Sequence, residues 1–162
     1  PYGQTKLDDE KLASKCAAQG LRVIGLRYFN VFGIGQNPSY AGVIPQFIQK
    51  ISKHESPIIE GDGNQIRSFT FIDDVVRANY LAFESKIDHA FFNIATEKMT
   101  TINELAELLI KMSELDLKSI YKNQRQGDIK KSYADISKAK KLLRWNPEIN
   151  LENGLKEIFP KI

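Results

Sequence analysis

Apolar residues recur along the chain in two alternating patterns, one with the period of a helix and one typical of strands. In 43–53 the apolar residues are three or four positions apart, which predicts a helix. In 21–33 and 90–95 they form nearly continuous runs, which predict buried strands. Along the whole chain, the patterns predict helices over 2–19, 43–53, 73–85, 101–112, 136–143 and 151–159, and strands over 21–33, 57–60, 68–72, 90–95 and 119–122. Strands that alternate with helices indicate an α/β fold of packed layers.

Several predicted helix ends carry capping signals. Gly20 follows the first helix and favours its termination, because glycine adopts the left-handed conformation without strain. Thr101 and Glu104 have the spacing of a capping box at the start of the most regular helix. Asp73 or Asp74 is expected to cap the helix that ends near residue 85.

The composition is that of an ordinary folded protein with one domain's length, 162 residues. Hydrophobic residues make up 42% and charged residues 27%, which excludes disorder as a global description. No apolar run approaches about 18 residues, so we expect no membrane partner. The net charge of +3 is spread along the chain, which argues against nucleic-acid binding.

Cys16 is the one cysteine in the sequence and has no partner for an internal disulfide. His54 and His89 lie at spacings from it that do not match a zinc site. We therefore expect no metal, and a reducing, cytoplasmic setting.

Tyr2 and Lys6 are four residues apart in the first predicted helix and so share one of its faces. The ammonium of Lys6 would favour the ionised form of the Tyr2 phenol, which turns a poor base into a usable one. The same spacing also occurs in an ordinary amphipathic helix whose lysine stem covers apolar surface.

Six motifs, in a fixed order, give the sequence a resemblance to a known family. They are PYGQTK (1–6), RYFNVFG (27–33), VIP (43–45), GDGNQIRSFTFIDD (61–74), NIA (93–95) and RQGDIKKSYADISKAKKLLRWNP (125–147). Together they resemble the extended short-chain dehydrogenase/reductase family, and within it the nucleotide-sugar epimerases and dehydratases. The greatest resemblance is to the 4-epimerases of UDP-glucose and UDP-N-acetylglucosamine.

The resemblance implies NAD as the cofactor and a UDP-sugar as the substrate. Tyr2 would be the acid and base for the sugar 4-hydroxyl, and Lys6 would bind the nicotinamide ribose. Tyr28 would also contact the cofactor. Hydride would leave sugar C4 for NAD and return to the other face of a 4-keto intermediate.

The resemblance also implies a site for the diphosphate and ribose of the substrate. Asn30 would bind the diphosphate through its side chain, and Arg67 and Arg125 would clamp it, because a guanidinium bonds phosphate oxygens in pairs. Asp128 would bind the ribose hydroxyls. Each of these residues also has an ordinary structural explanation, as a turn residue or a solvated surface charge.

Four further positions would contact the uracil or the sugar. The backbone at Ile58 and Glu60 would contact the uracil, and Val43 belongs to the same substrate set. Ser132 would line the sugar pocket, where a small residue leaves room for an N-acetyl group. An exposed loop serine is the alternative explanation for Ser132.

The implied architecture is the carboxy-terminal part of an extended Rossmann-type fold. Residues 1–41 would end the dinucleotide-binding domain, and 42–162 would form mainly the substrate-binding domain, with 61–93 partly returning to the Rossmann sheet. The sequence has no glycine-rich GxxGxxG loop for the cofactor phosphates. We therefore expect a fragment of a longer enzyme, a homodimer when complete, that by itself neither retains NAD nor turns over substrate.

Two other functions fit the same residues. A dehydratase or decarboxylase of the family would use much the same nucleotide-sugar site. A non-catalytic module that binds UDP-sugars or assembles with another chain would need no cofactor.

Overall fold

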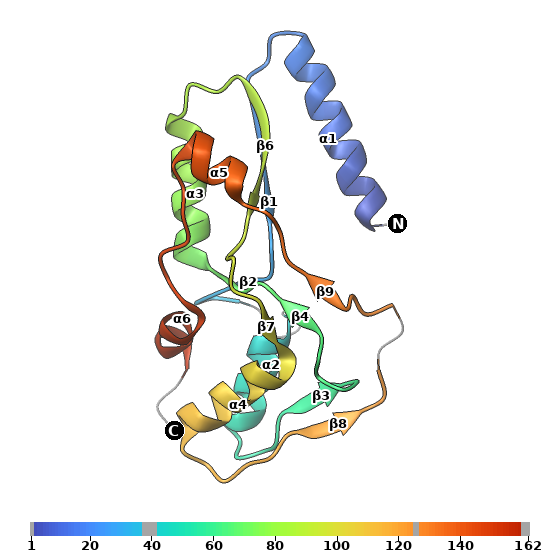
Figure 1. Cartoon of the computed structure of the whole chain (residues 1–162), viewed down its shortest axis with the longest axis vertical. Helices are drawn as coiled ribbons and strands as arrows, with labels where there is room; N and C mark the ends of the chain where they lie inside the picture. The colour runs from blue at the N-terminus through green and yellow to red at the C-terminus, as the bar shows by residue number, and fades with distance from the viewer. Residues whose placement is uncertain (1, 37–41, 125–126, 160–162) are drawn as a thin grey trace.

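The computed structural model describes residues 2–36, 42–124 and 127–159 and is a mixed α/β structure in which strands alternate with helices (Figure 1). The helices are α1 (Tyr2–Ala18), α2 (Val43–Ile51), α3 (Ile72–Glu84), α4 (Ile102–Ser113), α5 (Ser137–Leu143) and α6 (Leu151–Ile158). The strands are β1 (Val23–Tyr28), β2 (Val31–Phe32), β3 (Ile58–Glu60), β4 (Ile66–Arg67), β5 (Thr70–Phe71), β6 (His89–Ile94), β7 (Thr100–Thr101), β8 (Ile120–Lys122) and β9 (Lys131–Ser132). Among these described residues, no helix has both the length and the apolar character needed to cross a membrane.

Strands β1 and β6 form a parallel pair whose register runs from Val23 opposite His89 to Tyr28 opposite Ile94. Helices α3 and α5 lie on one side of this pair and α1 on the other (Figure 1). The apolar side chains buried under α3 and α5 form the sheet core, which consists of Val75, Ala78, Ala82, Ala90, Phe92, Ile94, Ala95, Ile136, Ala139, Leu143 and Trp145. None of the residues of α1 is buried, so this helix contributes nothing to the sheet core.

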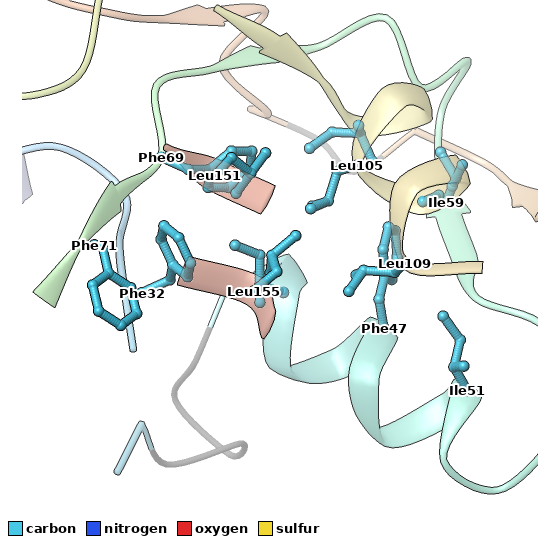
Figure 2. Packing of buried hydrophobic residues seen from close by; sticks show 13 residues of the cluster. Phe32, Phe47, Ile51, Ile59, Phe69, Phe71, Leu105, Leu109, Leu151 and Leu155 are labelled. Carbon is cyan, nitrogen blue, oxygen red and sulfur yellow. The ribbon is translucent and has the colours of Figure 1, made fainter. Parts of the chain in front are cut away.

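A second cluster, the helix core, lies between α2, α4 and α6 (Figure 2). It consists of Phe32, Ile44, Phe47, Ile51, Ile59, Phe69, Phe71, Ile102, Leu105, Ala106, Leu109, Leu151 and Leu155. Figure 2 shows the side chains of α2 and α4 pointing toward each other on one side and the rings of Phe32 and Phe71 on the other. A Cβ on Gly154 would lie 2.7 Å from Phe71 and 2.8 Å from Phe32, so a residue without a side chain lets α6 approach these rings.

The structure divides the strand that the sequence predicts over 21–33. β1 ends at Tyr28, and Asn30 follows with a φ of 39°. Asparagine tolerates this left-handed conformation better than most residues, and it turns the chain out of the β1–β6 pair. The next strand, β2, pairs instead with β5, with Val31 opposite Thr70.

The predicted cap of α3 is wrong. The N-cap is Phe71, which makes no side-chain cap bond, and the helix begins at Ile72. The Asp74 carboxylate, only 1% exposed, instead accepts hydrogen bonds from Arg77 and from the backbone N–H groups of Glu148 and Ile149, at 2.8, 2.9 and 3.0 Å. A side chain predicted to cap its own helix therefore fixes a distant segment to that helix.

Other predicted boundaries are confirmed. Gly20 ends α1 with a φ of 93°, and the capping box of Thr101 and Glu104 is present at the start of α4. β4, β7 and β9, of two residues each, form a small sheet that the apolar patterns do not predict, with β4 in the middle. In that sheet Arg67 lies opposite Thr100 on one side and Ser132 on the other.

Replacing Asp74 by alanine should destabilise the protein by about 2–4 kcal/mol, because three buried or half-buried donors lose a charged acceptor. The neighbouring Asp73 is exposed and lies in the same first turn of α3, so Asp73→Ala is a matched control. It should cost less than about 1 kcal/mol, the size of a helix-dipole effect. Urea unfolding measures both values, and equal losses would contradict this role for Asp74.

Candidate functional site

One cavity of about 380 Å³ is lined by residues of the helix core and by residues of the segments around it. Six of the substrate residues predicted from the sequence line it: Asn30, Val43, Ile58, Glu60, Arg67 and Asp128. They come from the turn after β1, the start of α2, strand β3, strand β4 and the segment before β9. Apolar side chains of the helix core, among them Phe32, Phe47 and Phe69, line the rest of the cavity.

Arg67 and Asp128 form a half-buried ion pair in this cavity. Nη2 of Arg67 donates to Oδ1 of Asp128 at 2.7 Å, and the two side chains are 15% and 23% exposed. Nη1 donates to the carbonyl oxygens of Ile66 and Ile129 at 3.0 and 2.5 Å. Within the described residues, these bonds engage three of the five guanidinium N–H groups, which leaves two for a ligand.

The predicted second clamp residue, Arg125, lies outside the described residues.

Asn30 lines the cavity, and its side chain also contacts Ser132. Its Nδ2 donates to the carbonyl oxygen of Ser68 at 3.1 Å and to the hydroxyl of Ser132 at 3.4 Å. Ser132 is not among the residues that line the cavity, but this contact and the pairing of β4 with β9 hold it beside Asn30. A ligand oxygen that accepts from Asn30 would compete with the longer and weaker of the two bonds.

Gln65 belongs to the same site and was missed by sequence reasoning. Its side chain is almost fully buried, and its Nε2 donates to the Glu60 carbonyl at 2.6 Å and to Oδ2 of Asp128 at 3.0 Å. No pattern in the sequence marks Gln65, because its partner Asp128 lies 63 residues further along the chain and is brought to it by the tertiary structure.

The turn between β3 and β4 needs its glycines. Gly61 and Gly63 have φ values of 79° and 75°, which favour glycine. A Cβ on Gly63 would lie 1.9 Å from Oδ1 of Asn103, whose Nδ2 donates to the Asp62 carbonyl at 3.0 Å. The first turn of α4 therefore holds this turn in place and, with it, the two strands that carry Glu60 and Arg67.

Tyr2 and Lys6 share a face of α1 as predicted, with Nζ of Lys6 5.8 Å from the centre of the Tyr2 ring. Tyr2 is 77% exposed, and Nζ of Lys6 also donates to Asp9 at 3.1 Å. Neither residue lines the cavity, so the structure does not bring this pair to the predicted substrate residues.

Tyr28 also lies outside the cavity. It is at the end of β1, where its hydroxyl donates to Oδ1 of Asn79 at 2.9 Å. It lines a different cavity, of about 410 Å³, together with Arg22 and Phe83. Its contact with a cofactor stays a prediction.

Helix α1 is attached to β1 by a paired hydrogen bond between charged groups. Nε and Nη2 of Arg27 donate to the two carboxylate oxygens of Glu10 at 2.6 and 2.7 Å. These bonds lower the pKa of Glu10 and raise the pKa of Arg27. The guanidinium also lies 5.6 Å from the centre of the Phe91 ring. This contact, together with a hydrogen bond of 3.4 Å between Ser14 and His89 of β6, connects the helix that carries Tyr2 and Lys6 to the β1–β6 pair.

Comparisons with known sequences agree on one protein family. A family model described as the NAD dependent epimerase/dehydratase family matches residues 1–95. The chain is 40% identical to a putative UDP-glucose 4-epimerase of Methanocaldococcus jannaschii over 160 residues, which cover 98% of this chain and 52% of the relative. It is 32% identical to a UDP-N-acetyl-alpha-D-glucosaminuronate decarboxylase of Bacillus cytotoxicus, covering 96% of this chain and 51% of the relative.

The fold is similar to that of a solved epimerase. The crystal structure of UDP-glucose 4-epimerase with UDP-glucose from Thermotoga maritima matches with a TM-score of 0.92 and 42% identity, covering 97% of this chain and 51% of that one. The chain therefore spans about half the length of the relatives it matches.

The Glu10 carboxyl should titrate below its ordinary pKa of 4.5, because Arg27 stabilises the carboxylate. A lowered pKa means that the bond stabilises the folded protein above pH 4.5 and that this contribution is lost as the pH falls through the lowered value. The Glu10 side-chain ¹³C signal in NMR reports the midpoint, and the amide signals of α1 should shift in the same transition.

Arg27→Ala is the control for this titration and should return the midpoint of Glu10 toward its ordinary value. An identical midpoint in the two proteins would show that Arg27 does not hold the Glu10 carboxylate in solution.

Proposed function

We propose, because the chain belongs to the NAD-dependent epimerase/dehydratase family, that it is part of a nucleotide-sugar 4-epimerase. The substrate would be UDP-glucose and UDP-galactose or their N-acetylated forms. One cavity carries the proposal, since it gathers six side chains or backbone positions that the sequence assigns to a UDP-sugar. These six residues come from five separate segments, and the family resemblance implies that all six belong to one substrate site.

The ion pair in the cavity supports binding of a nucleoside diphosphate. Arg67 retains two N–H groups that can donate to phosphate oxygens, and Asn30 can turn its Nδ2 from Ser132 to the same group. Asp128 has one donor on each oxygen and keeps lone pairs for ribose hydroxyls. The backbone at Ile58 and Glu60 would then contact the uracil at the far end of β3.

Ser132 would stand at the sugar end of the site, beside Asn30. A small side chain there leaves space for an acetamide group, so the proposal includes N-acetylated sugars.

The cofactor would be held here only at its nicotinamide end. Lys6 and Tyr2 share an exposed face of α1, which fits a ribose and a reacting ring placed against that face, with Tyr28 as a further contact. NAD, when bound, supplies the acceptor and donor of the hydride at sugar C4.

Tyr2 would move the proton of the reaction. The phenolate takes the proton from the sugar 4-hydroxyl as the hydride leaves C4, which yields a 4-keto sugar. After the sugar has turned over in the site, Tyr2 returns the proton to the oxygen as hydride arrives on the other face. Lys6 would hold the ribose hydroxyls.

A decarboxylase or dehydratase of the same family is a second candidate, favoured by the similarity to the Bacillus cytotoxicus decarboxylase. A non-catalytic UDP-sugar module is a third, since the cavity is present while the sequence lacks a glycine-rich loop. The homodimer and the cytoplasmic setting stay predictions, as does the division into 1–41 and 42–162.

The 162-residue chain should bind UDP, and Arg67→Ala should raise the dissociation constant about tenfold or more, since a charged phosphate contact is lost. Arg67→Lys keeps the charge but not the paired donors and should lie between the two. Lys53→Ala removes an exposed charge outside the cavity and should leave binding unchanged. Titration calorimetry measures all four proteins, and failure of the unchanged chain to bind millimolar UDP would overturn the proposal.

The same chain should emerge from purification without NAD and should not interconvert UDP-glucose and UDP-galactose, because it has no loop for the cofactor phosphates. Acid extraction followed by chromatography measures bound NAD, and ¹H NMR of the anomeric protons follows the sugars. Stoichiometric, tightly held NAD would contradict this expectation.

A turnover assay of the source protein separates the two catalytic candidates. UDP-galactose formed from UDP-glucose supports the epimerase, whereas carbon dioxide released from UDP-glucuronate supports the decarboxylase.

A further inference from the structure

We propose that Gln65 is a positioning residue, which orients Asp128 toward the ribose of a uridine nucleotide and so sets a preference for ribose over 2′-deoxyribose. This inference rests on the proposed function, in which Asp128 binds the ribose hydroxyls. Gln65 itself would not touch the nucleotide and would act through the Asp128 carboxylate.

The two donors on Asp128 come from different directions and fix its carboxylate plane. Gln65 donates to Oδ2 at 3.0 Å, and Arg67 donates to Oδ1 at 2.7 Å. With a single donor, the carboxylate could rotate about the bond between Cβ and Cγ. With one donor on each oxygen, it cannot rotate without breaking a hydrogen bond. Each oxygen still has a free lone pair for a ribose hydroxyl.

Gln65 is itself held on several sides. Its side-chain Nε2 also donates to the Glu60 carbonyl at 2.6 Å, and its backbone carbonyl accepts from the N–H of Ile102 at 3.1 Å. The side chain packs against the turn before it, where a Cβ on Gly61 would lie 3.1 Å from Nε2. The position of the Asp128 carboxylate therefore depends, through Gln65, on the positions of β3 and α4.

The remaining polar atom of the Gln65 side chain indicates that this side chain contributes little to the stability of the fold. Its Oε1 is buried and has no hydrogen-bond partner among the described residues. An unsatisfied buried acceptor offsets much of what the two Nε2 bonds contribute to folding. Glu60 is exposed and Asp128 is 23% exposed. If Gln65 is changed, water can therefore replace its amide at the carbonyl oxygen of Glu60 and at Oδ2 of Asp128. Removing the amide should therefore cost little stability and should release the carboxylate.

The experiment compares UDP with 2′-deoxy-UDP by titration calorimetry on the 162-residue chain. The unchanged chain should prefer UDP by about tenfold, the value of one hydrogen bond to a charged acceptor. Gln65→Met keeps the length of the side chain without its donors, and should weaken UDP about fivefold or more while changing 2′-deoxy-UDP less than about twofold. The preference for ribose should therefore fall from about tenfold to about fourfold or less.

Two further variants complete the test. Gln124→Met changes an exposed glutamine near the same turn that does not line the cavity, and should keep the full preference. Asp128→Asn should lose the preference, and adding Gln65→Met to it should cause no further loss, as expected for residues that act in series.

Gln65→Glu keeps the inference testable if Gln65→Met does not fold. The ionised carboxylate would repel Asp128, so the preference should be absent at pH 8 and should partly return at low pH, where a protonated carboxyl can donate.

The outcomes separate this inference from the proposed function. If Gln65→Met weakens both nucleotides equally, or keeps the full preference, Gln65 does not position Asp128. If the unchanged chain binds both nucleotides equally well, Asp128 does not sense the 2′-hydroxyl, and the inference fails while the proposed nucleotide site stands. If it binds neither, the proposed function and the inference both fail.

Discussion

A strand of two residues, β4, joins the parts of the chain that form the cavity. Ile66 and Arg67 pair with β7 on one side and with β9 on the other. The residue before them, Gln65, receives the first N–H of α4, which adds that helix to the same assembly. Backbone pairing at this one place brings Arg67 beside Asp128 and sets Ser132 beside Asn30. The chemistry of the site depends on it, because none of these contacts is between neighbours in the sequence.

The chain passes between two cores, and the cavity lies at the boundary of one of them. Ile24 and Leu26 of β1 pack against the sheet core, and β2, which begins three residues after β1 ends, contributes Phe32 to the helix core. Asn30, with its positive φ, makes this transition. Its side chain can reach both Ser68 and Ser132 because the backbone turns at that residue. The residue that makes the turn is therefore also the residue proposed to bind the diphosphate, and the two explanations do not exclude each other.

Helix α1 is held in another way. None of its residues is buried, and its described polar contact with β1 is the Glu10–Arg27 pair. Apolar packing couples α2, α4 and α6 into one body. A salt bridge, a hydrogen bond between Ser14 and His89 of β6, and a loop connect α1 to the sheet. The pair of Tyr2 and Lys6 is consequently determined within its helix by the four-residue spacing, whereas its position relative to the cavity depends on a few polar contacts.

Local patterns determined much of this protein from the sequence alone. Periodic apolar positions, the capping box of Thr101 and the terminating Gly20 located the helices, because helix formation depends on neighbours within four residues. Ordered motifs indicated candidate substrate residues, and six of these candidates line one cavity. Tertiary structure alone decided the two-residue strands, the burial of Asp74 under a distant segment and the contact between Gln65 and Asp128. These features consist of hydrogen bonds between residues far apart in the chain, and such bonds leave no periodic signal, since a partner's position is set by how the cores pack.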